Sequence, residues 1–282
     1  MKIGIIGLGL IGGSIAKAIR ENTKHEVLGF DVAKEVENRA KLLAVVEGFL
    51  IEGDPSTCDM VIIALYPTET LQYLDRHKED FKRGAVVIDC CGIKKQICKM
   101  GNALSEQYGF HFIGGHPMAG IERSGFAFSS AEIFKEATMI LTPKQNEDLS
   151  LMNEVSKFFR SLGFGKLQIT TWQEHDKMIA YTSQLAHVVS SAYIKNDLSH
   201  KHKGFSAGSF QDMTRVAKLN EVMWTNLFMD NRTYLLDEIE QLMHRLSLYQ
   251  AAIKDEDATK LKMLLKEGRE KRQAIEEEPD FE

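Results

Sequence analysis

A glycine turn between a short apolar run and a helical segment constrains the fold of this chain most strongly. Residues 7–12 read Gly-Leu-Gly-Leu-Ile-Gly and fit the pattern G-x-G-x-x-G. Lys2–Ile6 before the turn predicts a strand, and Gly13–Arg20 after it predicts an amphipathic helix. In this context the glycines allow a tight turn, close approach of a pyrophosphate and close packing of the helix on the sheet. We therefore expect a dinucleotide-binding domain at the N-terminus.

An acidic residue in the right place supports this expectation and bears on the choice of cofactor. Asp31 closes the second predicted strand, 19 residues after Gly12, where a carboxylate binds ribose hydroxyls. Val32 and Ala33 follow it instead of an arginine, which favours NAD over NADP, although Lys34 is close. The predicted cofactor-binding residues are Gly7, Leu8, Gly9, Leu10, Ile11, Gly12, Asp31, Leu65, Tyr66 and Pro67. The last three line the nicotinamide side or simply begin a helix.

Short apolar runs alternate with helical patterns through the first 170 residues. This alternation predicts a mainly parallel, doubly wound α/β sheet of the Rossmann type. The predicted strands are Lys2–Ile6, Glu26–Phe30, Met60–Ala64, Ala85–Asp89, His111–Gly115, Ala137–Thr142 and Lys166–Thr170. The predicted helices between them include Gly12–Ile19, Thr68–His77, Lys94–Gln107 and Asn146–Leu162.

The pattern becomes entirely helical after Thr170, so we place a domain boundary there, with residues 1–170 and 171–282 on either side. Thr171 to Glu174 form a capping box, and the break Lys201–Gly204 separates two helices. An apolar seam recurs at spacings of four and three along a later helix. It comprises Leu235, Ile239, Leu242, Leu246, Tyr249 and Ile253. The seam is either internal core or the interface of a homodimer.

Composition excludes several classes of function. The net charge of −5 argues against nucleic acid as a partner, and no apolar run is long enough to span a membrane. A predicted strand begins directly after Met1, so we expect no signal peptide. The four cysteines lack the spacing of metal ligands, which predicts buried free thiols and no metal site. We expect a cytoplasmic protein.

Three segments carry candidate chemistry. His116 lies in the run Gly114–Gly120, where Pro117 biases the backbone before it toward an extended conformation. A histidine held beside a nicotinamide can take the proton of a hydroxyl as hydride leaves, although the segment also suits a plain surface turn. Ser183 and His187 lie four residues apart on a helix, where they form either a site or a polar core edge. Arg215, expected to be partly buried, binds either an anionic ligand or Asp212.

Together, the motifs resemble the prephenate dehydrogenase family, which includes arogenate-using members. The resemblance covers nearly the whole chain and rests on the glycine turn, Gly114–Gly120 with Glu122 and Ser124–Gly125, Ser183 with His187, and Asp212–Arg215 with Trp224. It implies a Rossmann domain followed by an all-helical dimerisation domain. It also implies NAD-dependent oxidative decarboxylation of prephenate to 4-hydroxyphenylpyruvate.

The resemblance also assigns roles to residues. It makes His116, Ser183 and His187 the catalytic set and Arg215 the ligand of a substrate carboxylate. Trp224 and Glu122 join these four residues as substrate-binding. One departure is Gly92, which stands where many members have a serine; water, Cys91 or nothing replaces that hydroxyl.

Three alternatives remain open at this stage. The first is an arogenate dehydrogenase, since prephenate and arogenate differ only in a keto or amino group. The second is an enzyme like the β-hydroxyacid dehydrogenases, for which Lys177 would supply the catalytic lysine. The third is a non-catalytic NAD-binding sensor.

Overall fold

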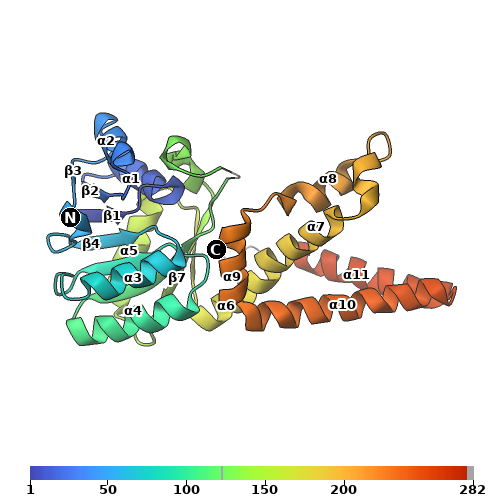
Figure 1. Ribbon diagram of the computed structural model, residues 1–282. Helices are drawn as coiled ribbons and strands as arrows, with labels where there is room; N and C mark the ends of the chain where they lie inside the picture. The colour runs from blue at the N-terminus through green and yellow to red at the C-terminus, as the bar shows by residue number, and fades with distance from the viewer. Residues whose placement is uncertain (122, 278–282) are drawn as a thin grey trace. The chain divides into compact units, whose positions relative to one another are not determined.

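The computed structural model describes residues 1–121 and 123–277, which fall into two compact units (Figure 1). The first unit is Met1–Asp176, and the second begins at Lys177. This division lies six residues after the predicted boundary between residues 170 and 171. The reason is local: His175 and Asp176, near the start of a helix, are hydrogen-bonded within the first unit.

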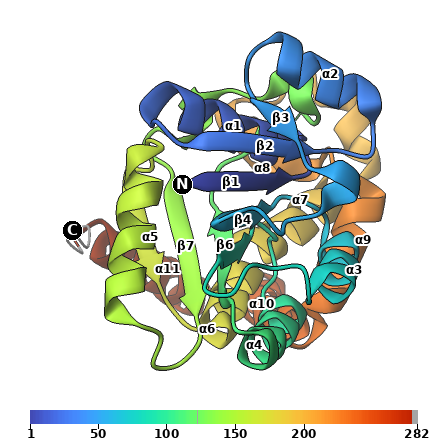
Figure 2. The same cartoon turned by 90° about the vertical axis from the view of Figure 1, so that its left-hand side faces the viewer.

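The first unit is a mostly parallel sheet covered by helices on both faces (Figure 2). Among the described residues, eight strands form one sheet in the order β3-β2-β1-β4-β5-β6-β7-β8, in which β7 runs antiparallel to β6. The strands are β1 (Lys2–Ile6), β2 (Glu26–Phe30), β3 (Gly48–Phe49), β4 (Met60–Ile63), β5 (Val86–Asp89), β6 (His111–Pro117), β7 (Thr138–Pro143) and β8 (Lys166–Ile169). The helices are α1 (Leu10–Asn22), α2 (Lys34–Leu42), α3 (Pro67–His77), α4 (Lys95–Tyr108) and α5 (Leu149–Ser161).

Alternating side chains of the strands feed two cores, one on each face. Ile5 of β1 packs with Ile15 of α1 and Phe159 of α5 in one core. Its neighbour Ile6 packs with Leu74 of α3 in the other core, together with residues of α4. Burial on both faces explains why the strands are nearly continuous apolar runs. The α/β prediction is confirmed, and all seven predicted strands are present. The sequence did not predict β3, which has two residues of which one is glycine, or α2, which is short and mostly polar.

Helices are the only regular elements in the described residues of the second unit. After α6 (Trp172–Ile179) these are a π-helical segment Ala180–Leu185, α7 (Ala186–Ile194), a 3-10 turn Asp197–Lys201, α8 (Gly208–Thr214), a 3-10 turn Arg215–Ala217, α9 (Glu221–Asp230), α10 (Arg232–Lys254) and α11 (Ala258–Glu277). Thr171 supplies one of the two hydrogen bonds of the predicted capping box, since the Glu174 N–H donates to Oγ1 of Thr171 at 3.2 Å. No helix in the described part of the chain has the length and apolarity needed to cross a membrane.

The predicted apolar seam of α10 is divided between two environments. Leu235 is buried and Tyr249 donates its hydroxyl to the Leu264 carbonyl of α11, so part of the seam is internal packing. Ile239 and Leu242 are partly buried, whereas Leu246 and Ile253 are exposed among the described residues, so the end of the seam is only partly covered there.

Candidate active site

The glycine turn joins β1 to α1 at the carboxyl edge of the sheet. Gly7 has φ +86°, a conformation that favours glycine, and a Cβ on Gly12 would lie 1.9 Å from the Gly7 carbonyl oxygen. A Cβ on Gly9 would meet nothing within 4 Å, so the backbone is open to a ligand there. The side chain of Leu8 is in the core, whereas Leu10 and Ile11 begin α1 and are partly exposed. The turn therefore has the shape that a pyrophosphate requires at a helix N-terminus.

Asp31 lies beside this turn and is held in place by backbone groups. Its carboxylate accepts hydrogen bonds from the Leu8 N–H and the Ala33 N–H, both at 2.9 Å. Lys34 is paired with the buried Glu37 at 2.7 Å, so its charge is already compensated. This pairing reduces the reason to expect a 2′-phosphate at this position.

The turn after β4 and the turn after β5 lie on the same sheet edge. Leu65 and the exposed Tyr66 precede Pro67, which is the first residue of α3. After β5, the buried Cys91 thiol lies 3.3 Å from the Thr70 hydroxyl. Cys91 therefore faces α3 and does not replace the hydroxyl missing at Gly92. Cys58, Cys91 and Cys98 are buried free thiols as predicted, whereas Cys90 is partly exposed.

His116 sits near the end of β6, which is parallel to β5 and so ends at the same edge as β1. Gly114 and Gly115, the two residues before His116, have no room for a side chain because neighbouring strands lie too close. A Cβ on Gly114 would lie 2.2 Å from the Thr142 hydroxyl, and one on Gly115 would lie 2.4 Å from the Asp89 carbonyl. The His116 segment is therefore part of an interior strand, paired with β5 and β7, and not a surface turn.

A buried ion pair supports the strand beneath His116. The Lys94 ammonium, fully buried, donates to the Asp89 carboxylate and to the Gly115 carbonyl. The other Asp89 oxygen accepts the Gly115 N–H at 3.2 Å. Burial alone would lower the pKa of Lys94, but Asp89 outweighs this effect and the pKa is raised. The charged Lys94 and its two acceptors fix the backbone next to His116.

His116 is the outer member of a chain of three side chains. Its Nδ1 lies 2.9 Å from Nε2 of His175, and Nδ1 of His175 lies 2.8 Å from Oδ1 of Asp176. His175 and Asp176 are buried, whereas His116 is partly exposed. Asp176 also accepts the backbone N–H groups of Lys94 at 2.8 Å and Lys95 at 2.9 Å, at the N-terminus of α4.

Both imidazoles are favoured in their neutral form. Burial lowers the pKa of His116 well below its usual range, and the nearby His175 and Lys94 lower it further. Burial also lowers the pKa of His175, although the hydrogen bond to Asp176 opposes the shift. A neutral His116 at physiological pH is able to accept a proton.

The remaining candidates lie in the second unit, around α7. The ring of His187 stacks on Trp224 of α9 with centroids 3.9 Å apart. Its Nδ1 donates to the Ser183 backbone carbonyl at 2.8 Å, so the Ser183 hydroxyl is not its partner. Ser183 lies in the π-helical segment, a feature common at functional sites because it shifts side chains around the helix axis.

Arg215 departs from the expectation of partial burial. It is exposed at the start of a 3-10 turn, Arg215–Ala217, that packs against α7. Within the described residues no ion pair joins Arg215 to Asp212, so the structure does not support the hypothesis that Asp212 is the partner of this arginine. Lys177, the residue that a β-hydroxyacid dehydrogenase would use, is exposed on α6. Glu122, predicted to bind substrate, lies outside the described residues.

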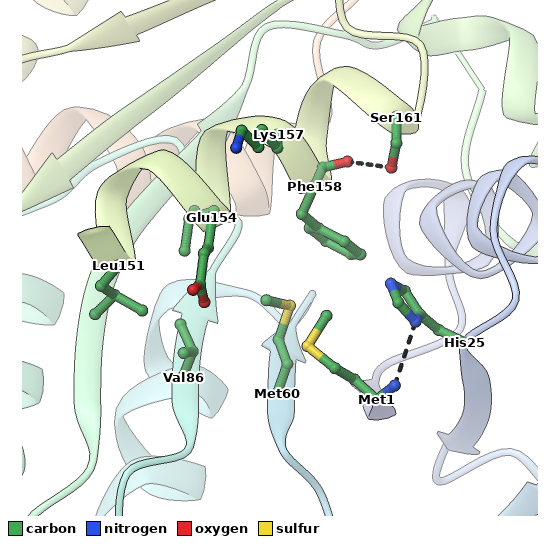
Figure 3. Close-up of a pocket in the computed structure, with 10 residues that line it drawn as sticks. Met1, His25, Met60, Val86, Leu151, Glu154, Lys157, Phe158 and Ser161 are labelled. Atoms are coloured by element: carbon green, nitrogen blue, oxygen red, sulfur yellow. Dashed lines mark hydrogen bonds between the residues drawn. The ribbon is translucent and has the colours of Figure 1, made fainter. Parts of the chain in front are cut away.

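A separate cavity of about 340 Å³ is located at the opposite edge of the sheet (Figure 3). Met60 and Val86, at the amino ends of β4 and β5, line it together with Met1 and with Phe158 of α5. Ligands of parallel α/β sheets bind at the carboxyl edge, where the glycine turn and His116 lie. This cavity is therefore not part of the candidate site.

Sequence reasoning did not identify His175, Asp176, Lys94 or Asp89 as parts of the site. The only signal available was the pair His175-Asp176 close to the predicted boundary, where a histidine next to an acid had no assigned role. Nothing in the sequence places this pair beside β6, because the residues are 59 positions from His116.

Comparison with known proteins agrees with the division of the chain. The model of the prephenate dehydrogenase nucleotide-binding domain matches residues 15–166, and the model of the prephenate dehydrogenase dimerization domain matches residues 171–267. A prephenate dehydrogenase of Lactococcus lactis is 32% identical over 98% of this chain and 77% of its own length. A cyclohexadienyl dehydrogenase of Zymomonas mobilis is 27% identical over 99% of this chain and 97% of its own length.

Solved structures with similar folds extend over both units. A prephenate dehydrogenase of Aquifex aeolicus, in complex with hydroxyphenyl propionate and NAD+, has a TM-score of 0.84 and 26% identity and covers 98% of each chain. An arogenate dehydrogenase of Synechocystis has a TM-score of 0.83 and 25% identity over 98% of this chain and 100% of its own. The chain is therefore an oxidoreductase of the prephenate dehydrogenase family, built from the nucleotide-binding and dimerization domains of that family.

Proposed function

We propose that the protein catalyses the NAD-dependent oxidative decarboxylation of prephenate to 4-hydroxyphenylpyruvate. One observation carries the proposal: His116 is partly exposed at the same sheet edge as the glycine turn, and burial lowers its pKa so that the neutral form is favoured. A neutral imidazole there accepts the proton of the ring hydroxyl as hydride leaves the carbon that bears it. Loss of carbon dioxide makes the ring aromatic, so the protein mainly has to align the reactants and manage one proton.

The residues at the sheet edge fit NAD. The N–H groups at the start of α1 and the open backbone at Gly9 suit the pyrophosphate, and Asp31 suits the ribose hydroxyls. A 2′-phosphate would meet the Asp31 carboxylate, while Lys34 is occupied by Glu37. When bound, NAD+ supplies the hydride acceptor. Leu65, Tyr66 and Pro67 contribute the turn that borders the nicotinamide.

The helical unit supplies the substrate-binding groups in this proposal. Arg215 binds a carboxylate of the substrate as a charge-assisted pair. Ser183 and His187 are further substrate-binding residues in this proposal, and in the neutral His187 ring Nε2 is an acceptor because Nδ1 donates to the Ser183 carbonyl. The indole of Trp224 holds the His187 ring in place. Glu122 is retained as a substrate ligand on the family resemblance.

Two further parts of the proposal concern assembly and location. The dimerization domain and the exposed apolar residues of α10 support a homodimer. The four free thiols and the absence of disulfides in the described residues support a cytoplasmic protein.

Arogenate is the alternative substrate, supported by the Synechocystis arogenate dehydrogenase among the similar structures. The decisive experiment follows NADH absorbance with purified protein and NAD+, first with prephenate and then with arogenate. We expect turnover of prephenate and a loss of turnover in His116→Asn. If only arogenate is turned over, the protein is an arogenate dehydrogenase. If neither substrate yields NADH, the proposed function is refuted.

A further inference from the structure

His175 and Asp176 form a chain of hydrogen bonds with His116 in which the direction of each donor is fixed. Asp176 accepts the Lys94 and Lys95 backbone N–H groups at the N-terminus of α4, surroundings that suit a negative carboxylate. An ionised carboxylate only accepts hydrogen bonds, so Nδ1 of His175 must carry a proton to donate to it. In the neutral ring, Nε2 of His175 is then a bare acceptor.

The same reasoning continues to the outer ring. Because Nε2 of His175 accepts, Nδ1 of His116 must be the donor across their 2.9 Å contact. The neutral His116 ring then has no proton on Nε2. No hydrogen bond within the described residues uses this nitrogen, which is the one that remains to meet a substrate hydroxyl. The opposite arrangement would bring a bare Nδ1 of His175 against the Asp176 carboxylate.

We propose that His175 and Asp176 are positioning residues that fix the tautomer of His116, so that Nε2 is presented to the substrate as a proton acceptor. The proposal rests on the proposed function and deepens it. Asp176 orients His175, and His175 orients His116. Free histidine favours the opposite tautomer, with the proton on Nε2. His175 and Asp176 therefore stabilise a tautomer of His116 that the isolated ring would not favour.

The electrostatic surroundings match this role. Among the described residues, the charged groups around His116 and His175 are Asp176 on α6 and the Lys94–Asp89 pair between α4 and β5. On β7 the partner of His116 is the apolar Ile140. Lys94 disfavours a positive imidazole and is largely balanced by Asp89. Asp176 is then the anion that stabilises His116 once the ring has become positive.

The proton balance of the reaction calls for such a reversible acceptor. The hydroxyl O–H bond breaks and an N–H bond forms at Nε2 of His116 as hydride leaves the neighbouring carbon. The C–C bond to the carboxylate then breaks, and its electron pair enters the ring and makes it aromatic. The proton returns from Nε2 to the phenolic oxygen, so the overall reaction releases no proton and restores the same tautomer.

The tautomer can be measured without substrate or cofactor. Full-length protein with ¹⁵N-labelled histidine is examined by NMR at pH 8, and His116 is identified from the signals missing in His116→Asn. We expect Nδ1 protonated and Nε2 bare in both His116 and His175. A proton on Nε2 of His116 in the wild-type protein would overturn the proposal.

Paired variants of His175 separate positioning from packing. Glutamine places an amide N–H toward Asp176 and a carbonyl oxygen toward His116, so His175→Gln preserves the order of donors and acceptors. His175→Leu fills similar space without either group. We expect His175→Leu to lower kcat about 10- to 1,000-fold and to lose the His116 tautomer, and His175→Gln to retain most of both. Equal kcat in the two variants would refute positioning.

Controls separate this proposal from the proposed function and from misfolding. His111→Gln changes the histidine at the other end of β6, which contacts Glu147, and should leave kcat and the His116 signals unchanged. Circular dichroism and the thermal midpoint verify that each variant is folded. If neither prephenate nor arogenate is oxidised while the expected tautomer is observed, the proposed function fails and the positioning role stands.

Discussion

The sheet unit and the helical unit differ in how completely they bury their own groups. In the sheet unit, His175, Asp176, Lys94 and Asp89 are all buried and all paired. In the helical unit, Arg215 is exposed and His187 is only partly covered. Moving groups that are already desolvated and hydrogen-bonded costs free energy, so we expect the proton chemistry to be carried by the sheet unit. The helical residues still have solvent to exchange for a ligand.

The helical unit also lacks a complete core of its own. Its buried described residues are few: Ile179, Ala180, Gln184, Leu185, Ser190, Asn231, Leu235 and Ala252. Large apolar side chains on α10 and α11 are exposed instead, among them Leu236, Met243, Leu246, Ile253, Met263, Leu265 and Ile275. So much exposed apolar surface indicates an association site. The sheet unit buries most of its apolar strand and helix residues within the chain, whereas the helical unit leaves these apolar side chains exposed.

The largest expected effect removes the proton acceptor of the sheet unit. His116→Asn should lower kcat about 10²- to 10⁴-fold with little change in KM, because the ring acts only as hydride leaves. In the wild-type protein, kcat/KM should fall as pH drops through the pKa of His116, below the usual histidine range, since a protonated ring cannot accept. The variant should lose this acidic limb. Near-normal kcat with an unchanged pH profile would show that His116 is structural.

The next effect tests whether the helical unit acts by binding. Arg215→Ala should mainly raise KM, by an amount equivalent to about 2–5 kcal/mol, if the guanidinium holds a carboxylate equally in the ground and transition states. Lys218→Ala, which removes a cation from the exposed Lys218 just after the same 3-10 turn, is the matched control. A fall in kcat at constant KM would instead place Arg215 among the groups that act in the chemical step.

A third test addresses the incomplete core of the helical unit. Leu246→Glu places a charge among exposed apolar residues of α10 and should weaken dimerisation by about 2–3 kcal/mol or more if a second copy covers them. Sedimentation at micromolar concentration measures the change. Leu149→Glu, at an exposed leucine of the sheet unit, should leave the assembly intact. A wild-type protein that is monomeric and active at that concentration would contradict the dimer.

The smallest effect concerns cofactor choice in the sheet unit. Asp31→Ala should lower the affinity for NAD+ about tenfold, equivalent to about 1.4 kcal/mol, because the carboxylate binds the ribose hydroxyls. It should also reduce the difference in kcat/KM between NAD+ and NADP+, because the same carboxylate repels the 2′-phosphate of NADP+. The values of kcat/KM with each cofactor measure this. Equal efficiency of the wild-type protein with both cofactors would refute the role of Asp31.

Local sequence determined much of the sheet unit. The glycine pattern at residues 7–12 encodes its own turn, since the φ of Gly7 and the contact of Gly12 depend on neighbours in the chain. Strands such as Val86–Asp89 were predictable because burial on both faces requires apolar residues throughout.

Tertiary structure decided how the candidate residues are arranged. The burial of Arg215 was predicted wrongly because apolar neighbours in sequence do not establish that a short helical turn is covered. Cys91 was a candidate to replace the family serine, but the path of the chain after β5 directs its thiol toward Thr70.

By itself, the sequence determined the fold class and the position of the cofactor turn, and it singled out His116 as the candidate histidine, because each depends on residues close together in the chain. Only the folded chain could bring His175 and Asp176 to His116 and Lys94 to Asp89 and Gly115. Hydrogen bonds between side chains depend on atom positions set by the packing of whole helices and strands. No pattern of spacing records those positions.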